Sequence, residues 1–159
     1  MLIRELQESD NTALAKMIRE VFVEYNAPQA GTVYSDPTTD NLHELFKAPK
    51  SVLWVAEIEG KAVGCSGIYP TEGLSQQVAE LVKVYVANEV RGTGVGRLLM
   101  QKSFASAVAL GYTQLYLESL SAFSKAVSIY EKVGFRKLDQ PLIDSVHDTC
   151  NIWMLKDLD

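Results

Sequence analysis

The stretch ELVKVYVANEVRGTGVGR, residues 80–97, decides the fold. Its first half is an apolar, β-branched run that predicts a strand, and its second half carries three alternate glycines, Gly92, Gly94 and Gly96. A helix is expected to begin at the end of the stretch. Backbone N–H groups at the start of a helix bind anions, and glycines allow a phosphate to approach them closely. The stretch therefore predicts a phosphate-binding loop, to which Arg91 and Arg97 add positive charge.

Three phosphate-binding sequence patterns compete for this loop. A P-loop needs four residues between its glycines and a Lys-Ser/Thr pair after them, and the chain has neither. The dinucleotide fingerprint G-x-G-x-x-G needs a glycine where Arg97 stands, although Glu118 would supply its acidic residue at a plausible distance. A small NAD-binding domain is therefore the weaker alternative. The third pattern, Gln/Arg-x-x-Gly-x-Gly/Ala, is matched at every fixed position by residues 91–96.

Length and composition place the chain among ordinary globular domains. At 159 residues it is expected to form a single domain over residues 1–159. A net charge of −5 without a basic run argues against a nucleic-acid partner. The sequence has no apolar run of membrane-spanning length and no signal-peptide character at its start, so we expect no membrane association and a cytoplasmic location. Cys65 and Cys150 are too few for a disulfide framework or a zinc site, and no metal is expected.

The remaining pattern predicts a mixed α/β domain. A helix is expected where Leu14, Ile18, Phe22 and neighbouring apolar residues share one face. Around it we expect a strand at 2–6, a loop at 26–40, a short helix at 41–46 and a hairpin of 51–58 with 61–69. Further on we expect a strand at 114–118, a helix capped by Ser121 and stopped by Gly134, and strands at 136–138 and 149–155. Gly64 and Gly67 predict a bulge or a close backbone approach inside the hairpin. The strand–helix–strand unit built on residues 80–118 predicts two parallel strands.

A second motif makes the family resemblance specific. Residues 126–135 match the pattern A-x-x-x-Y-x-x-x-G-F, with Ala126, Tyr130, Gly134 and Phe135 at its fixed positions. Together with residues 91–96 and the order of elements, the chain resembles the GCN5-related N-acetyltransferase (GNAT) superfamily. The resemblance implies a GNAT-like fold: a central mixed sheet of about seven strands flanked by about four helices, with a parallel strand pair that splays apart to hold coenzyme A.

The resemblance implies acetyl-CoA as co-substrate, with its pyrophosphate on Arg91, Gly92, Thr93, Gly94, Val95, Gly96 and Arg97. The pantetheine arm would bond like an extra strand to backbone groups of Val84, Tyr85 and Val86. Family members often carry an asparagine at the position that is Phe123 here. Ser124, or else Ser121, is the expected substitute.

Tyr130 matches the family tyrosine that lies near the coenzyme sulfur, where a hydrogen bond would ease departure of the thiolate. A backbone N–H at Tyr85 or Val86 is the expected donor to the developing oxyanion.

Aminolysis also needs a base, since an alkylammonium with a pKa near about 10.4 must lose a proton before attack. Glu80 is the preferred candidate, with Glu118 and His147 as alternatives. Tyr34 and Asp36, in the predicted loop, are expected to line the amine pocket.

The resulting prediction is an acetyl-CoA-dependent N-acetyltransferase that acts on a primary amine of a small molecule or peptide. No cysteine lies near the motifs in sequence, so direct transfer in a ternary complex is expected. The alternative is a coenzyme-A-binding sensor or interaction domain without catalysis. A homodimer is compatible with the family.

Overall fold

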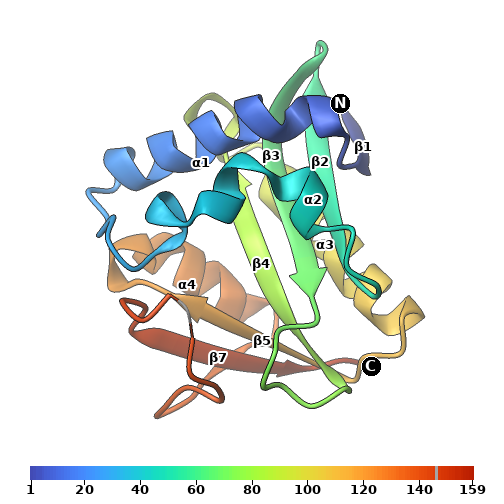
Figure 1. The fold of residues 1–159 in the computed structure, drawn as a ribbon, viewed down its shortest axis with the longest axis vertical. Helices are drawn as coiled ribbons and strands as arrows, with labels where there is room; N and C mark the ends of the chain where they lie inside the picture. The colour runs from blue at the N-terminus through green and yellow to red at the C-terminus, as the bar shows by residue number, and fades with distance from the viewer. Residues whose placement is uncertain (146) are drawn as a thin grey trace.

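The computed structural model describes residues 1–145 and 147–159, and over these residues seven strands form one mixed sheet (Figure 1). The strand order is β1-β2-β3-β4-β5-β7-β6. The strands are β1 (Leu2–Glu5), β2 (Val52–Ile58), β3 (Lys61–Tyr69), β4 (Val78–Val86), β5 (Gln114–Ser119), β6 (Arg136–Lys137) and β7 (Ile152–Asp157). Only β4 and β5 pair in parallel; the other neighbouring described strands are antiparallel. The predicted mixed sheet and its parallel pair are confirmed.

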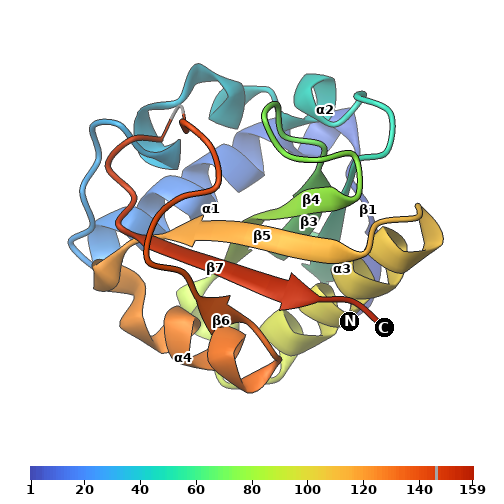
Figure 2. The ribbon, with the colours of Figure 1, turned by 90° about the horizontal axis from the view of Figure 1, so that it is seen from below.

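Four α-helices in the described residues cover the two faces of the sheet: α1 (Asn11–Glu24), α2 (Leu42–Leu45), α3 (Val95–Ala109) and α4 (Ser124–Lys132). Figure 2 shows α1 and α2 on one face, with α3 and α4 on the other. The predicted apolar face of α1 is buried, since Leu14 and Ile18 have no exposed surface and Phe22 is 1% exposed. Among these described helices, none combines the length and apolarity needed to cross a bilayer.

The parallel pair opens after three residues. Val78 pairs with Gln114, and the last matched pair is Glu80 with Tyr116. Beyond that pair β4 continues to Val86 and β5 to Ser119, but no described residues of the two strands are paired. Strand β4 therefore presents an open edge from Leu81 onward, as the predicted splay requires.

A bulge lies on the other side of this opening. Cys65 of β3 faces Tyr85 of β4, while Gly67 faces Val82, so two residues of β4 stand opposite one residue of β3. One of the two is Lys83, whose φ of +57° lies in the left-handed region. A Cβ on Gly67 would meet the Val52 carbonyl oxygen at 2.4 Å, so the predicted close backbone approach is present. Bulges of this kind bend a strand and re-aim a side chain.

Helix α4 begins at Ser124, three residues after Ser121, which was predicted to cap it. A 3-10 turn, Ser121–Phe123, precedes it, and the Phe123 N–H donates to the Leu120 carbonyl. The turn places the Phe123 ring against Phe22 and Tyr25 of the α1 region, at centroid distances of 5.2 and 5.7 Å. This aromatic packing ties the start of α4 to the opposite face of the sheet.

Candidate active site

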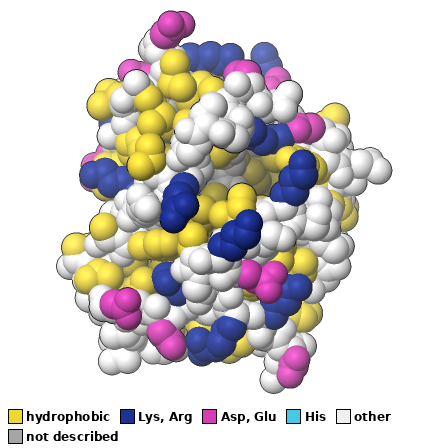
Figure 3. Space-filling view, turned by 180° about the vertical axis from the view of Figure 1, so that it is seen from behind, with side chains coloured by type: hydrophobic (Ala, Val, Ile, Leu, Met, Phe, Trp, Pro, Cys, Tyr) yellow, Lys and Arg dark blue, Asp and Glu magenta, His cyan; other side chains and the backbone are white. Residues whose placement is uncertain are grey.

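A cavity of about 1160 Å³ fills the space between the splayed strands. Its walls include the open edge of β4, the end of β5, the glycine loop, the start of α3 and one face of α4. Residues from 32–38, 69–73, 142–145 and 147–150 line its other end. On the face seen in Figure 3, Lys and Arg side chains gather around a hollow walled by hydrophobic side chains. The cavity therefore has an end built from the glycine loop and an end built from loops rich in ionisable groups.

The glycine loop has room for a ligand at its surface. Gly92 and Gly94 have φ values of +76° and +89°, and a Cβ at either position would meet no protein atom within 4 Å. Gly94 immediately precedes the first residue of α3, so helix N–H groups open onto the same space. Gly96 instead allows the start of α3 to pack closely on β4, because a Cβ added there would lie 3.3 Å from a methyl group of Val86. This open cradle at a helix start suits a phosphate group.

Arg91 is bonded to the protein rather than free to face an anion. Its guanidinium pairs with the Glu24 carboxylate and donates to the Tyr25 hydroxyl and the Val86 carbonyl. The predicted contribution of Arg91 to the local positive charge is therefore offset by Glu24, and its visible role is to fasten the loop to α1. Arg97 is exposed and lines the cavity.

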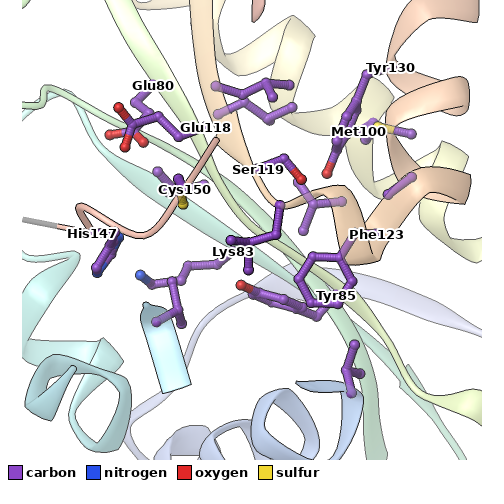
Figure 4. A pocket seen from close by; sticks show the side chains of 18 of the residues that line it. Glu80, Lys83, Tyr85, Met100, Glu118, Ser119, Phe123, Tyr130, His147 and Cys150 are labelled. Carbon is purple, nitrogen blue, oxygen red and sulfur yellow. The ribbon is translucent and has the colours of Figure 1, made fainter. Parts of the chain in front are cut away.

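Tyr130 of α4 reaches the middle of the cavity, and Figure 4 shows its hydroxyl pointing inward near Ser119. Burial raises the pKa of this phenol above its ordinary value, so Tyr130 stays protonated at neutral pH. Tyr85, on the open edge of β4, is also a cavity residue, and burial raises its phenol pKa as well. Both side chains therefore act as hydrogen-bond donors or apolar walls, not as bases.

Glu80 and Glu118 lie side by side where the strands part (Figure 4). The Thr71 hydroxyl donates to Glu80 Oε1 at 2.6 Å. Burial raises the pKa of Glu80 to about 7; the Thr71 hydrogen bond opposes this rise, while the negative charge of Glu118 adds to it. The Tyr116 hydroxyl donates to Glu118 Oε2 at 2.8 Å. Glu118 Oε1 is buried and has no hydrogen-bond partner among the described residues.

Asp36 and His147 meet at the loop-built end of the cavity. His147 Nε2 lies 2.7 Å from Asp36 Oδ2, and the backbone N–H and hydroxyl of Thr38 donate to Asp36 Oδ1. Burial would raise the pKa of Asp36, but its bonds to His147 and Thr38 more than offset that effect and leave it lowered. Asp36 is thus an ionised carboxylate whose two oxygens both have protein partners.

Comparison with known proteins gives this site a family. Residues 15–135 match the model of the acetyltransferase (GNAT) family. The chain belongs to the GNAT family. It is 34% identical over 158 residues to YjgM, an uncharacterised N-acetyltransferase of Escherichia coli, covering 99% of this chain and 95% of that protein. The enzyme class is therefore that of the N-acetyltransferases.

Solved GNAT structures share the fold. An acetyltransferase from Staphylococcus aureus superposes with a TM-score of 0.85 at 21% identity, over 99% of each chain. An acetyltransferase from Salmonella typhimurium, solved with its cofactor acetyl-CoA, gives a TM-score of 0.78 at 18% identity, over 100% of this chain and 94% of that one. These likenesses confirm the predicted GNAT fold.

Most of the predicted GNAT site residues line the cavity, but not all of them. Ser124 is exposed and is not a cavity residue, because the turn before α4 directs it to solvent. Thr93 also lies off the cavity, and its hydroxyl donates to the Val90 carbonyl of the same loop. Tyr34 is not a cavity residue either; its ring packs 6.0 Å from that of Phe22. The predicted contacts of these three residues with coenzyme or acceptor therefore stay predictions, and their side chains do not line this cavity.

Three cavity residues escaped the sequence reasoning. Cys150 lines the cavity although it lies far from both motifs in sequence. Thr71 and Cys150 come from loops in which no sequence pattern marks a site. Lys83 did carry a signal, since it is the one basic residue within the otherwise largely apolar run of β4.

Proposed function

We propose that this GNAT enzyme moves the acetyl group of acetyl-CoA directly to a primary amine, with donor and acceptor bound together. One observation carries the proposal. A single cavity joins an open glycine cradle at a helix start to a carboxylate pair at the point where two parallel strands separate. The solved relative that contains acetyl-CoA has the same fold, which supports this coenzyme as the donor.

The glycine loop and the open strand edge would hold the coenzyme. Backbone N–H groups around Gly92, Gly94 and Gly96 suit its pyrophosphate, and Arg97 adds a cation beside them. The unpaired edge of β4 at Val84, Tyr85 and Val86 suits the amides of the pantetheine arm, as an added strand does at any sheet edge. Bound there, acetyl-CoA supplies a thioester as acetyl donor.

Glu80 is our choice of base. An ordinary carboxylate is a poor proton acceptor for an ammonium group, but the environment of Glu80 raises its pKa to about 7. A base whose pKa lies near the working pH combines an adequate ionised fraction with a useful affinity for the proton. Glu118, directly beside it, is placed to hold the ammonium form of the acceptor before that proton is lost.

Tyr130 would donate a hydrogen bond to the departing sulfur. Its raised pKa keeps the proton on the phenol, so a hydrogen bond, not full proton transfer, is the role its environment favours. Cys150 does not favour an acyl-enzyme, because burial, together with the charges of Glu118 and Glu80, raises the pKa of its thiol to about 12. A thiol is a nucleophile as the thiolate, so a protonated Cys150 favours direct transfer.

The test is turnover of a panel of primary amines, read by release of free thiol and by mass of the acetylated product. Glu80→Gln is expected to lower kcat by about 10²- to 10⁴-fold, the usual contribution of a general base. Glu131→Gln, an exposed glutamate of α4 outside the cavity, is the matched control and should keep full activity. Binding of acetyl-CoA without acetylation of any amine would favour a sensor. Equal activity of the two variants would remove Glu80 as the base.

A further inference from the structure

Lys83 is a buried lysine whose side chain is aimed at the acceptor end of the cavity. It lies on the bulge of β4, in the left-handed backbone conformation, and the residue is only 8% exposed. Figure 4 shows its amino group directed toward His147, on the side of the cavity that also holds Glu80 and Cys150. A lysine at φ +57° is strained, and such strain persists where the surrounding structure imposes it, often at functional sites.

The amino group of Lys83 has no partner in the part of the chain that the structure describes. Within residues 1–145 and 147–159, no hydrogen bond or ion pair involves Lys83 Nζ. The nearest carboxylates already have partners, because Asp36 is bonded to His147 and Thr38, and Glu80 accepts from Thr71. Burial lowers the pKa of this amino group, and the negative charges of Asp36 and Glu80 oppose that effect. An anion that reaches Lys83 would therefore favour its charged form and supply the missing hydrogen-bond acceptor.

Glu118 has an oxygen that lacks a hydrogen-bond donor among the described residues. Its Oε1 is a buried acceptor that no donor among the described residues satisfies, and it belongs to the same cavity. One end of the cavity thus holds an amino group and a carboxylate oxygen that both lack a partner among the described residues. A ligand that carries both a positive and a negative group could satisfy both.

We infer that the acceptor is an amino acid, or a similarly small primary amine that bears a carboxylate. Its carboxylate would accept hydrogen bonds from Lys83 Nζ, and its ammonium would donate to Glu118 beside Glu80. This inference rests on the proposed acetyl transfer and names the substrate class for it. A phosphate-bearing amine fits less well, because the loops and strands at this end also bring Asp36, Glu72 and Asp144 to the cavity, and these carboxylates oppose a doubly charged anion.

The experiment compares kcat/KM for matched acceptors: each of several amino acids against its carboxamide, its decarboxylated amine and an aminoalkyl phosphate. Hydrogen bonds to charged groups predict that the amino acid is preferred by about 10- to 100-fold. In Lys83→Met the ratio of kcat/KM for the amino acid to that for its matched acceptors should fall to about one. Lys16 is an exposed lysine of α1, and Lys16→Met should keep the wild-type ratio. The melting temperature of each variant shows that it is folded.

The results distinguish failure of the inferred carboxylate-bearing acceptor from failure of the proposed acetyl transfer. Turnover of simple amines at the rates of amino acids, or a preference that survives in Lys83→Met, overturns the carboxylate inference and leaves the acetyl transfer intact. A preference for the aminoalkyl phosphate also overturns it. If no acceptor turns over, the acetyl transfer itself is contradicted. The binding of carboxylate ligands then tests the role of Lys83 separately. N-acetyl amino acids should bind the CoA-saturated wild type more tightly than their amides do. Equal affinity of acid and amide in the wild type refutes the inference. The same affinity ratio in Lys83→Met as in the wild type also refutes it.

Discussion

The pH dependence of catalysis should move in opposite directions when the two neighbours of Glu80 are changed one at a time. Thr71→Val keeps the shape of the side chain but removes the 2.6 Å hydrogen bond that favours ionised Glu80. Hydrogen bonds to charged groups contribute about 1.5–3 kcal/mol, and 1.36 kcal/mol corresponds to one pH unit. The midpoint of the rise in kcat/KM, expected near pH 7 in the wild type, should therefore move upward by about one pH unit or more. Glu118→Gln removes a negative charge that raises the pKa of Glu80, so its midpoint should move downward.

The assay is the pH profile of kcat/KM, paired with NMR titration of the Glu80 side-chain carboxyl in the free enzyme. The titration keeps the readout independent of acceptor binding, in which Glu118 is also involved. Thr12→Val, an exposed threonine of α1, is the control and should leave both midpoints in place. Shifts in the same direction for Thr71→Val and Glu118→Gln, or no shift in either, would refute the electrostatic account of Glu80.

Two further outcomes follow from the same groups. Because the folded-state pKa of Glu80 lies above the ordinary value of 4.5, its ionisation disfavours the folded state; the stability present below about pH 4.5 is lost as the pH rises to about 7. Relative to Glu80→Gln, the wild-type free energy of unfolding should thus fall by about 3 kcal/mol over this window in urea titrations, and a parallel pH dependence of the two proteins would contradict the raised pKa. Cys150→Ser should retain most of the acetyl transfer rate, and mass spectrometry during turnover should find no acetylated Cys150; an inactive variant with acetyl-cysteine in the wild type would establish an acyl-enzyme instead.

Local signals explain what could be predicted from the sequence. The glycines at 92–96 are needed for a left-handed backbone, an open cradle and close packing on β4, and all three requirements arise within one short segment. The apolar face of α1 is equally local, since its period alone identifies the buried residues. Such features depend on a few neighbours in the chain, and their prediction is confirmed.

The parts that escaped prediction depend on contacts between distant segments. Thr71 reaches Glu80 from a loop, and Cys150 enters the cavity from another, so neither role is visible until the strands are paired. Ser124 was expected to face the coenzyme, but packing of Phe123 on Phe22 and Tyr25 sets the turn that exposes it. The bulge at Lys83 likewise arises from the register between β3 and β4, which a single strand sequence does not specify.

Binding of acetyl-CoA at the glycine loop is tested most directly by melting temperature with and without the coenzyme. Ligand at about 100 times its Kd should stabilise the protein by about 2.7 kcal/mol, which corresponds to roughly 5–10 °C for a domain of this size. Gly94→Glu places a side chain in the cradle. Gly111→Glu is its matched control, because Gly111 also has a positive φ of +90° and open space around it but lies outside the cavity. We expect a shift in the wild type and in Gly111→Glu, and none in Gly94→Glu. No shift in the folded wild type, or an equal shift in Gly94→Glu, would contradict it.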